Sequence, residues 1–254
     1  MYLRVVVFIF VFIFCSNVRA VSSLTFIAED LHPYHFKNKS GEADGASVDI
    51  AKAVLKEAKL QAEFEIMPMA RAFHQLAANP NTIMLSLLKT PARQNQFKWL
   101  GAVYFTDAYL VSLKSHKDEV THLNHAKFYK VGTIRGYLSA KYLIKMGFEE
   151  DKNLILASYY QQAWQMLYKG RTDFVLMNTL TLDNELKMSG LDPDLITKRL
   201  HLADFPSILY FAANNQLDDK TANLISQALK TIKVSGEYQA ILKKWQLPLP
   251  PSIN

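Results

Sequence analysis

A short polar segment that follows an apolar run is the part of this 254-residue sequence best suited to bind an anion. Within Ser86 to Arg93 (SLLKTPAR), Thr90 suits a helix N-cap and Pro91 suits the first helical position, whose N–H would be unpaired anyway. Arg93 then falls in the first turn of an expected short helix, where a cation opposes the helix dipole unless an anion lies between them. N–H groups, a hydroxyl and a guanidinium together predict a carboxylate site. The alternative is a surface arginine paired with a neighbouring acid.

Other conspicuous polar residues are weaker candidates. Arg71 follows Pro68 at the start of an expected helix and could reach the same site, or could pair with Glu63 or Glu65 on the surface. Two histidines, His122 and His125, are three residues apart, but a third ligand of suitable spacing is missing, so we expect no metal. We find no Gly-x-Ser-x-Gly motif and no paired carboxylates in one segment. No catalytic residue and no cofactor are predicted.

Strands and helices that alternate along the chain must position these residues. Periodicity in the first half predicts, in order, a strand over 24–28, a helix over 48–60, a strand over 62–66, a helix over 69–78 and a strand over 82–87. A second run comprises a strand over 129–134, a helix over 137–145, a strand over 154–157, a helix over 159–169 and a strand over 173–177. Such alternation predicts α/β architecture with mostly parallel sheets flanked by helices.

Two segments that favour strand connect the two runs. Residues 109–113 lead from the first run to the second, and residues 207–213 return the chain to two final helices over 218–230 and 236–245. Two crossings between two sheets predict a two-lobed fold with a hinge. We assign residues 21–110 and 206–254 to one lobe and 111–205 to the other. Because ligands of open α/β sheets bind beyond the carboxyl ends of the strands, the site is expected in the cleft between the lobes.

The first twenty residues have the composition of a secretory signal peptide. Arg4 precedes an apolar run over 5–14, and Val18-Arg19-Ala20 suits a signal peptidase. Ten apolar residues are too few to span a bilayer, which takes about 20. Cleavage after Ala20 removes Cys15 and leaves 27 Lys and Arg against 23 Asp and Glu, a net charge of +4 and no thiol. The charges are dispersed, so we expect no binding of nucleic acid. The signal peptide predicts a periplasmic protein, which we expect to be a monomer.

Several segments together resemble a known family, the family 3 bacterial extracellular solute-binding proteins. They are Gly45–Val54, Thr90–Arg93 with Phe97–Gly101, Val131–Gly136, Gly170–Asp173, and Ser235–Tyr238 with Lys244-Trp245. The resemblance covers nearly all of residues 24–247 in the family's order. Pro68-Met-Ala-Arg-Ala72 further resembles a divergent branch whose ligands are often unassigned. The resemblance implies a type II periplasmic-binding-protein fold and a receptor for polar amino-acid ABC transporters.

The resemblance also implies roles for individual residues. Arg93 corresponds to the partner of the ligand carboxylate, and Thr90 to a second contact. The aromatic wall against the ligand corresponds to Tyr34 and Phe36, and the edge of the cleft to Asp30. The turn into a helix of the second lobe corresponds to Arg135, Gly136 and Tyr137.

Two departures from the family pattern bear on the ligand. Ser86 and Leu88 stand where the family has Gly and Thr, and Asn178 stands where an Asp holds the ligand ammonium. A neutral amide cannot neutralise a buried ammonium, although Asp30 could substitute. We therefore expect a small anionic or zwitterionic solute that bears a carboxylate, either amino-acid-like or an organic acid, with or without a free α-amino group.

The expected function is capture of this solute by hinge closure, for an ABC permease or for sensing. The alternative is a periplasmic dehydratase of the cyclohexadienyl dehydratase type on the same fold, with Glu29 or Asp30 as general acid and base.

Overall fold

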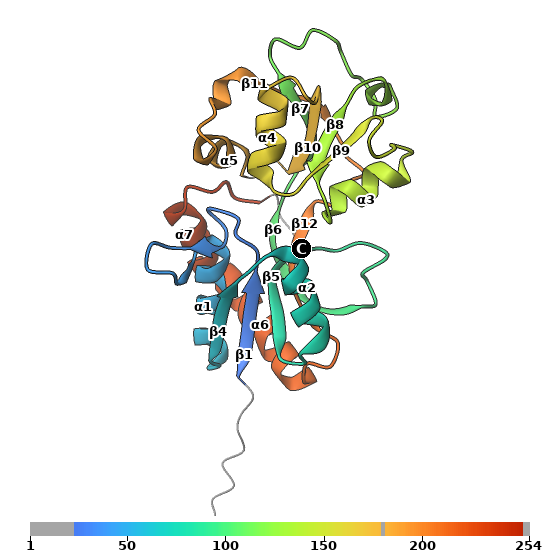
Figure 1. The fold of residues 1–254 in the computed structure, drawn as a ribbon. Coiled ribbons are helices and arrows are strands. Elements are labelled where there is room, and N and C mark those ends of the chain that lie inside the picture. Colours follow the sequence, from blue (N-terminus) through green and yellow to red (C-terminus); the bar gives the residue numbers. More distant parts are fainter. Residues whose placement is uncertain (1–22, 179–180, 251–254) are drawn as a thin grey trace, which may run out of the picture.

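The chain folds into two lobes, each built on a five-stranded sheet with helices on its faces (Figure 1). This computed structural model describes residues 23–178 and 181–250. The expected signal peptide and its cleavage site after Ala20 lie outside the described residues. Within them, no helix is long and apolar enough to cross a membrane.

The sheet of the first lobe has the strand order β4-β1-β5-β12-β6. Its strands are, in chain order, β1 (Leu24–Ala28), β4 (Ala62–Ile66), β5 (Thr82–Leu88), β6 (Phe97–Phe105) and β12 (Ile208–Asn214). β1 pairs in parallel with β4 and β5, whereas β12 is antiparallel to both β5 and β6. All five residues of β1 are buried, as expected for a central strand that is covered on both faces. A two-stranded ribbon, β2 (Phe36–Lys37) with β3 (Ala43–Asp44), lies between β1 and the first helix.

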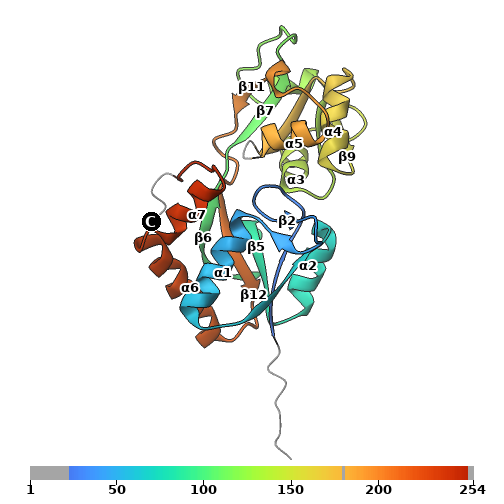
Figure 2. The same cartoon turned by 90° about the vertical axis from the view of Figure 1, so that its left-hand side faces the viewer.

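Helices cover both faces of this sheet. They are α1 (Ala46–Ala58), α2 (Met69–Ala78), α6 (Asp219–Val234) and α7 (Glu237–Lys244). Phe26 packs in one core cluster with Val54 of α1 and Ile225 of α6, while its neighbour Ile27 packs in another with Leu76 of α2. Because consecutive strand residues point to opposite faces, α2 lies across the sheet from α1 and α6 (Figure 2).

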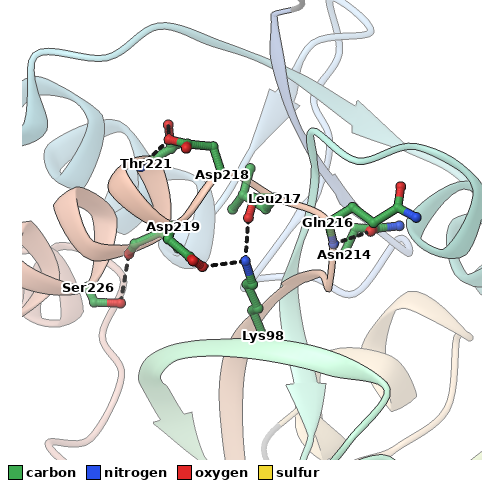
Figure 3. Close-up of polar contacts among 9 residues, drawn as sticks. Lys98, Asn214, Gln216, Leu217, Asp218, Asp219, Thr221 and Ser226 are labelled. Carbon is green, nitrogen blue, oxygen red and sulfur yellow. Dashed lines mark hydrogen bonds and ion pairs between the residues drawn. The ribbon is translucent and has the colours of Figure 1, made fainter.

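Polar contacts fix the start of α6 against the sheet (Figure 3). The Asp218 carboxylate caps the helix by accepting a hydrogen bond from the backbone N–H of Thr221 at 2.9 Å. Lys98 of β6 donates to the carbonyl of Leu217 at 2.5 Å and pairs with Asp219 at 2.6 Å. The chain that returns from the second lobe is thereby tied to the edge strand of the first.

The sheet of the second lobe has the order β11-β7-β10-β8-β9. Its strands are β7 (Ala108–Leu113), β8 (Val131–Ile134), β9 (Leu154–Ala157), β10 (Phe174–Asn178) and β11 (Ile196–His201). Its helices are α3 (Leu138–Lys145), α4 (Tyr160–Tyr168) and α5 (Leu182–Met188), with single 3-10 turns at His125–Phe128 and Pro193–Leu195. β8, β9 and β10 are parallel, and β7 is antiparallel to β10 and β11. Phe174 packs with Leu143 of α3, whereas Val175 packs with Trp164 of α4, so the two helices lie on opposite faces.

Two short crossings join the lobes. The first is residues 106–107, between β6 and β7, and the second is residues 202–207, between β11 and β12. Backbone hydrogen bonds link them, from Thr106 N–H to the Ser207 carbonyl at 2.6 Å and from Leu202 N–H to the Ala108 carbonyl at 2.9 Å. The sequence-based lobe boundary after residue 110 therefore falls inside β7, which pairs with the second sheet.

The structure corrects the expectation of a helix at Pro91. Residues 91–96 form successive turns, with Arg93 N–H donating to the Thr90 carbonyl at 3.0 Å and Gln96 N–H to the Arg93 carbonyl at 2.9 Å. The backbone hydrogen bonds of this segment connect residues three apart, as in turns, and the chain enters the long strand β6 at Phe97. Thr90 is therefore not a helix N-cap, and the helix-dipole argument for an anion at this turn fails.

Candidate functional site

Strand ends from both sheets meet at a cleft between the lobes. Glu29 follows the carboxyl end of β1, and Ser86 and Leu88 lie at the carboxyl end of β5. From the second lobe, Tyr137 follows β8 and Asn178 ends β10. This is where an open α/β sheet places its ligands, because backbone groups and loop side chains converge there.

The cleft encloses about 900 Å³, including the part open to solvent. Its lining comes from both lobes and from the crossings between them. The lining residues are Glu29, Leu31, Met69, Phe73, Ser86, Leu87, Leu88, Arg93, Ala108, Gly136, Tyr137, Leu138, Ser139, Leu176, Met177, Asn178, Thr181, Glu185, Phe205 and Leu209. Most of these side chains are apolar, so the few polar groups are well placed to orient a small ligand.

Arg93 is the basic side chain of this lining. Its guanidinium lies 4.9 Å from the ring centre of Phe73 and donates to the carbonyl of Leu88 at 3.3 Å. Within the described residues, no carboxylate lies within 4.0 Å of it. Burial lowers its pKa, which is the response of a cation that lacks a counter-ion. The guanidinium is therefore available for the carboxylate of a ligand.

Glu29 carries a direct contact between the lobes. Its carboxylate accepts a hydrogen bond from the hydroxyl of Tyr137, which stands at the N-terminus of α3 in the second lobe. Burial raises the pKa of Glu29 to about 7, the Tyr137 hydrogen bond opposes this rise, and the carboxylates of Glu185 and Asp30 add to it. Gly136, whose φ of 84° lies in the left-handed region, turns the chain so that Tyr137 faces the cleft.

Glu185 is a second acidic group in the lining. It lies on α5 and is 4% exposed. Its Oε2 accepts a hydrogen bond from the indole of Trp164 at 2.7 Å, and its Oε1 accepts one from the hydroxyl of Thr181 at 2.5 Å. Burial raises its pKa, and these two hydrogen bonds partly oppose the rise. Within the described residues it forms no ion pair with a cationic side chain.

Of the sequence-based candidates, the structure brings together five in one cleft: Arg93, Ser86, Gly136, Tyr137 and Asn178. Ser86 lies on β5 of the first lobe and Asn178 ends β10 of the second, and both line the cleft together with Arg93. With the two acidic groups, the cleft has Arg93 and Glu29 on the side of the first lobe, and Tyr137, Asn178 and Glu185 on the side of the second.

The candidate aromatic wall is not in the cleft. Tyr34 is 2% exposed and packs against Tyr104 in the core, with 5.1 Å between ring centres. Phe36 packs edge-to-face on Trp245 at the C-terminus of α7, with 5.9 Å between ring centres. The ribbon of β2 and β3 turns this segment back onto the first lobe, which removes both rings from the ligand side.

Four other candidates also lie outside the lining. Thr90 is buried and Asp30 is exposed at the edge of the first lobe. Arg135 forms an exposed ion pair with Glu150, so its charge is already compensated. Arg71 is exposed on α2 and makes no ion pair with Glu63 or Glu65 in the part of the chain described. Nor do three His, Cys, Asp or Glu side chains of that part gather as metal ligands would.

Sequence reasoning missed Glu185 and Phe73 as cleft residues. Phe73 follows Met69 by four residues on α2, a spacing that puts both on one helix face. A signal for α5 was present: an acidic residue in its first turn, Lys187 in its last, and Gly190 two residues beyond. The burial of Glu185 depends on packing against α4 and had no local signal.

Two lobes joined by two crossings, with charged groups of both lobes facing one cleft, define a ligand-binding protein of the periplasmic-binding-protein fold. The model for "Bacterial extracellular solute-binding proteins, family 3" matches residues 25–248. The chain therefore belongs to this family and is a solute-binding protein.

Similar proteins agree with this assignment. An arginine-binding periplasmic protein from Mannheimia haemolytica is 28% identical over 218 residues, which are 84% of this chain and 86% of that protein. Among solved structures, a histidine kinase sensor domain with similarity to periplasmic binding proteins has a TM-score of 0.79 at 17% identity, covering 91% of this chain and 98% of that one. An ancestral amino acid-binding protein, a precursor of cyclohexadienyl dehydratase, has a TM-score of 0.72 at 21% identity, covering 88% and 94%. These two structures are similar in fold.

Proposed function

We propose that the protein captures an α-amino acid with a positively charged side chain in the cleft between its lobes. The observation that carries this proposal is the charge of the lining: one guanidinium, Arg93, and two carboxyl groups, Glu29 and Glu185, none of which has an ion-pair partner in the described residues.

The ligand carboxylate belongs with Arg93. A guanidinium can donate two parallel hydrogen bonds to a carboxylate, which gives both energy and orientation. The apolar ring of Phe73 lies against the guanidinium, and Leu87 and Leu88 line the same cleft, so a carboxylate bound there would meet less water and a stronger interaction.

The two carboxyl groups have raised pKa values, and a cation beside each would favour its ionised form. With Arg93 neutralised by the ligand carboxylate, two ionised carboxylates would be balanced by two cationic groups of the ligand, and only in part by a neutral amino acid. A lysine- or arginine-like solute supplies both an α-ammonium and a side-chain cation. The arginine-binding relative is consistent with this ligand class.

Asn178 brings a neutral amide to the cleft, and an amide cannot neutralise the α-ammonium of such a ligand. The buried carboxylate of Glu185, seven residues later along the chain, supplies the negative charge that Asn178 lacks. We propose Arg93, Glu185, Glu29, Ser86, Tyr137 and Asn178 as the residues that contact the ligand.

We further propose that binding closes the lobes about the crossings at residues 106–107 and 202–207. A ligand that touches both walls favours the closed state over the open one by its additional contacts. The mature protein would act in the periplasm as a monomer after cleavage at Ala20, and its closed form would deliver the solute to an ABC permease or report it to a sensor.

A thermal-shift panel on residues 21–254 tests the function. Arginine, lysine and ornithine should raise the melting temperature more than glutamine, glutamate or citrate, because ligand binding stabilises the folded state. Each compound, with prephenate included, is then assayed for turnover by NMR. Stabilisation by organic acids alone would contradict the ligand class, and loss of prephenate would support the dehydratase alternative.

A further inference from the structure

His35 is a buried group that connects the backbone of the first lobe to the cleft. It is 1% exposed and lies just before β2. Its Nδ1 lies 2.7 Å from the backbone carbonyl oxygen of Glu29, and its Nε2 lies 2.6 Å from Oγ of Ser86. Ser86 lines the cleft, so one hydrogen bond separates this histidine from the ligand.

The partners of His35 fix where its proton sits. A carbonyl oxygen can only accept, so Nδ1 must carry the hydrogen that is donated to Glu29. Burial lowers the pKa of His35 to about 4, so the ring is neutral at neutral pH. Nε2 then has a lone pair and no hydrogen, and the hydroxyl of Ser86 must donate to it.

This arrangement decides what Ser86 can offer a ligand. A serine hydroxyl has one hydrogen and two lone pairs, and its hydrogen is committed to His35. Only lone pairs remain toward the cleft. Ser86 can therefore accept a hydrogen bond from a ligand N–H group but cannot donate one to a ligand carboxylate.

We infer that His35 is a positioning residue that holds Ser86 as a hydrogen-bond acceptor for the ligand's α-ammonium, and so makes the first lobe select for a free α-amino group. The inference rests on the proposed function. Ser86 and Arg93 lie on the same wall, so a carboxylate held by Arg93 places the neighbouring α-ammonium on that wall as well.

Two substitutions of His35 separate this role from a general structural one. In His35→Gln the amide oxygen can occupy the place of Nε2 and still accept from Ser86. In His35→Asn the amide nitrogen can replace Nδ1 toward Glu29, but nothing replaces Nε2. Both variants are first compared with the parent by thermal melting, so that binding is measured only on folded protein.

The affinities for L-arginine and for 5-guanidinopentanoic acid, which lacks only the α-amino group, are measured by calorimetry on residues 21–254. We expect His35→Asn to weaken arginine binding about tenfold, the scale of one hydrogen bond to a charged group, while the desamino compound is unaffected. His35→Gln should retain most of the arginine affinity. Equal losses for both ligands, or equal losses in both variants, would overturn the inference.

A ligand-free measurement keeps this test independent of the proposed ligand. The ¹⁵N shifts of the imidazole in ligand-free protein should show a neutral ring with the hydrogen on Nδ1, and Ser86→Ala should shift the Nε2 resonance. A hydrogen on Nε2, or an Nε2 resonance insensitive to Ser86→Ala, would overturn the inference whether or not arginine binds. Failure of the parent protein to bind arginine, with the expected tautomer present, would instead contradict the proposed function.

Discussion

Arg93 is the residue on which recognition of the ligand carboxylate depends. Arg93→Ala should weaken binding of an amino acid by about 3 kcal/mol, or more than a hundredfold in Kd, because the bound carboxylate loses its charged partner. Arg93→Lys should recover only part of the loss, since an ammonium cannot form the two-pronged contact. The measurement is calorimetric titration with arginine.

Two other arginines provide matched controls for that prediction. Arg71 is exposed outside the lining, and Arg135 is paired with Glu150. Substitution of either by alanine should leave the affinity unchanged. An effect of Arg71→Ala as large as that of Arg93→Ala would show that the anion site lies elsewhere.

Glu29 gives the binding reaction a pH dependence with a definite sign. Its pKa is raised by burial to about 7 in the ligand-free protein, above the unfolded value, so its contribution to stability is largest at low pH and is lost as the pH rises through about 7. A cation placed beside the carboxylate favours the ionised form, so binding should release a proton. Affinity for arginine should therefore rise between about pH 5.5 and about pH 8.

Calorimetry in two buffers of different protonation enthalpy measures that proton. Near pH 6.5 the parent protein should release a fraction of a proton per arginine bound, and Glu29→Gln should release less. Glu185 and Tyr137, which face Glu29 from the second lobe, remain in that variant. Proton uptake on binding would contradict the placement of a cation at Glu29.

Among the charged residues of the cleft, the basic one, Arg93, could be predicted from the sequence, whereas the acidic residue Glu185 could not. Arg93 stands out because its turn follows a strand and precedes a long apolar segment. Glu185 does not, because its role follows from burial between α4 and α5, where Trp164 and Thr181 donate to it. Tyr34 was misplaced for a similar reason: local order does not show that β2 and β3 fold its ring into the core.

The turn that leads into helix α1 requires a glycine at position 45. Gly45 has φ 121°, and a Cβ added there would lie 2.5 Å from the carbonyl oxygen of Tyr34. Gly45→Ala should lower the free energy of unfolding by about 3 kcal/mol or more, because strain and a backbone clash add. Urea denaturation measures the loss.

Gly41 separates the two causes. It also has positive φ, 82°, but a Cβ there would meet nothing within 4 Å. Gly41→Ala should cost only about 1 kcal/mol, the cost of the left-handed conformation alone. If the two variants lost equal stability, the close contact between Gly45 and Tyr34 would not be present.

The spacing of apolar residues predicted the main strands and helices well, because each of these elements buries one or both of its faces in a regular pattern. α1 starts at Ala46 where a start at 48 was expected, and α6 continues to Val234 beyond the expected 230. The strands β6 and β11 were not predicted. Both are edge strands whose residues alternate poorly, and their pairing with β12 and β7 is set by distant parts of the chain.

For the molecule as a whole, the contact between Tyr137 and Glu29 joins the two lobes without a ligand. Tyr137→Phe removes the donor and should shift the ligand-free protein toward an open form. Small-angle X-ray scattering should then give a larger radius of gyration than for the parent, and saturating arginine should reduce the difference.

Tyr168→Phe is the control for that experiment. The Tyr168 hydroxyl donates to the carbonyl of Asp192 within the second lobe, so its removal should not change the distance between lobes. The same radius of gyration for Tyr137→Phe and for the parent would mean that this contact does not hold the lobes together in solution.

The proposed ligand carries two cationic groups, with its carboxylate at Arg93, its α-ammonium at Glu185 and its side-chain cation at Glu29. Calorimetric titration of residues 21–254 with L-arginine and with L-glutamine measures the contribution of the side-chain cation, in the parent protein and in Glu29→Gln. We expect one site per molecule, tighter binding of arginine than of glutamine, and a smaller preference for arginine in Glu29→Gln. Equal or tighter binding of glutamine, with no change in Glu29→Gln, would show that the cleft does not hold a second cationic group.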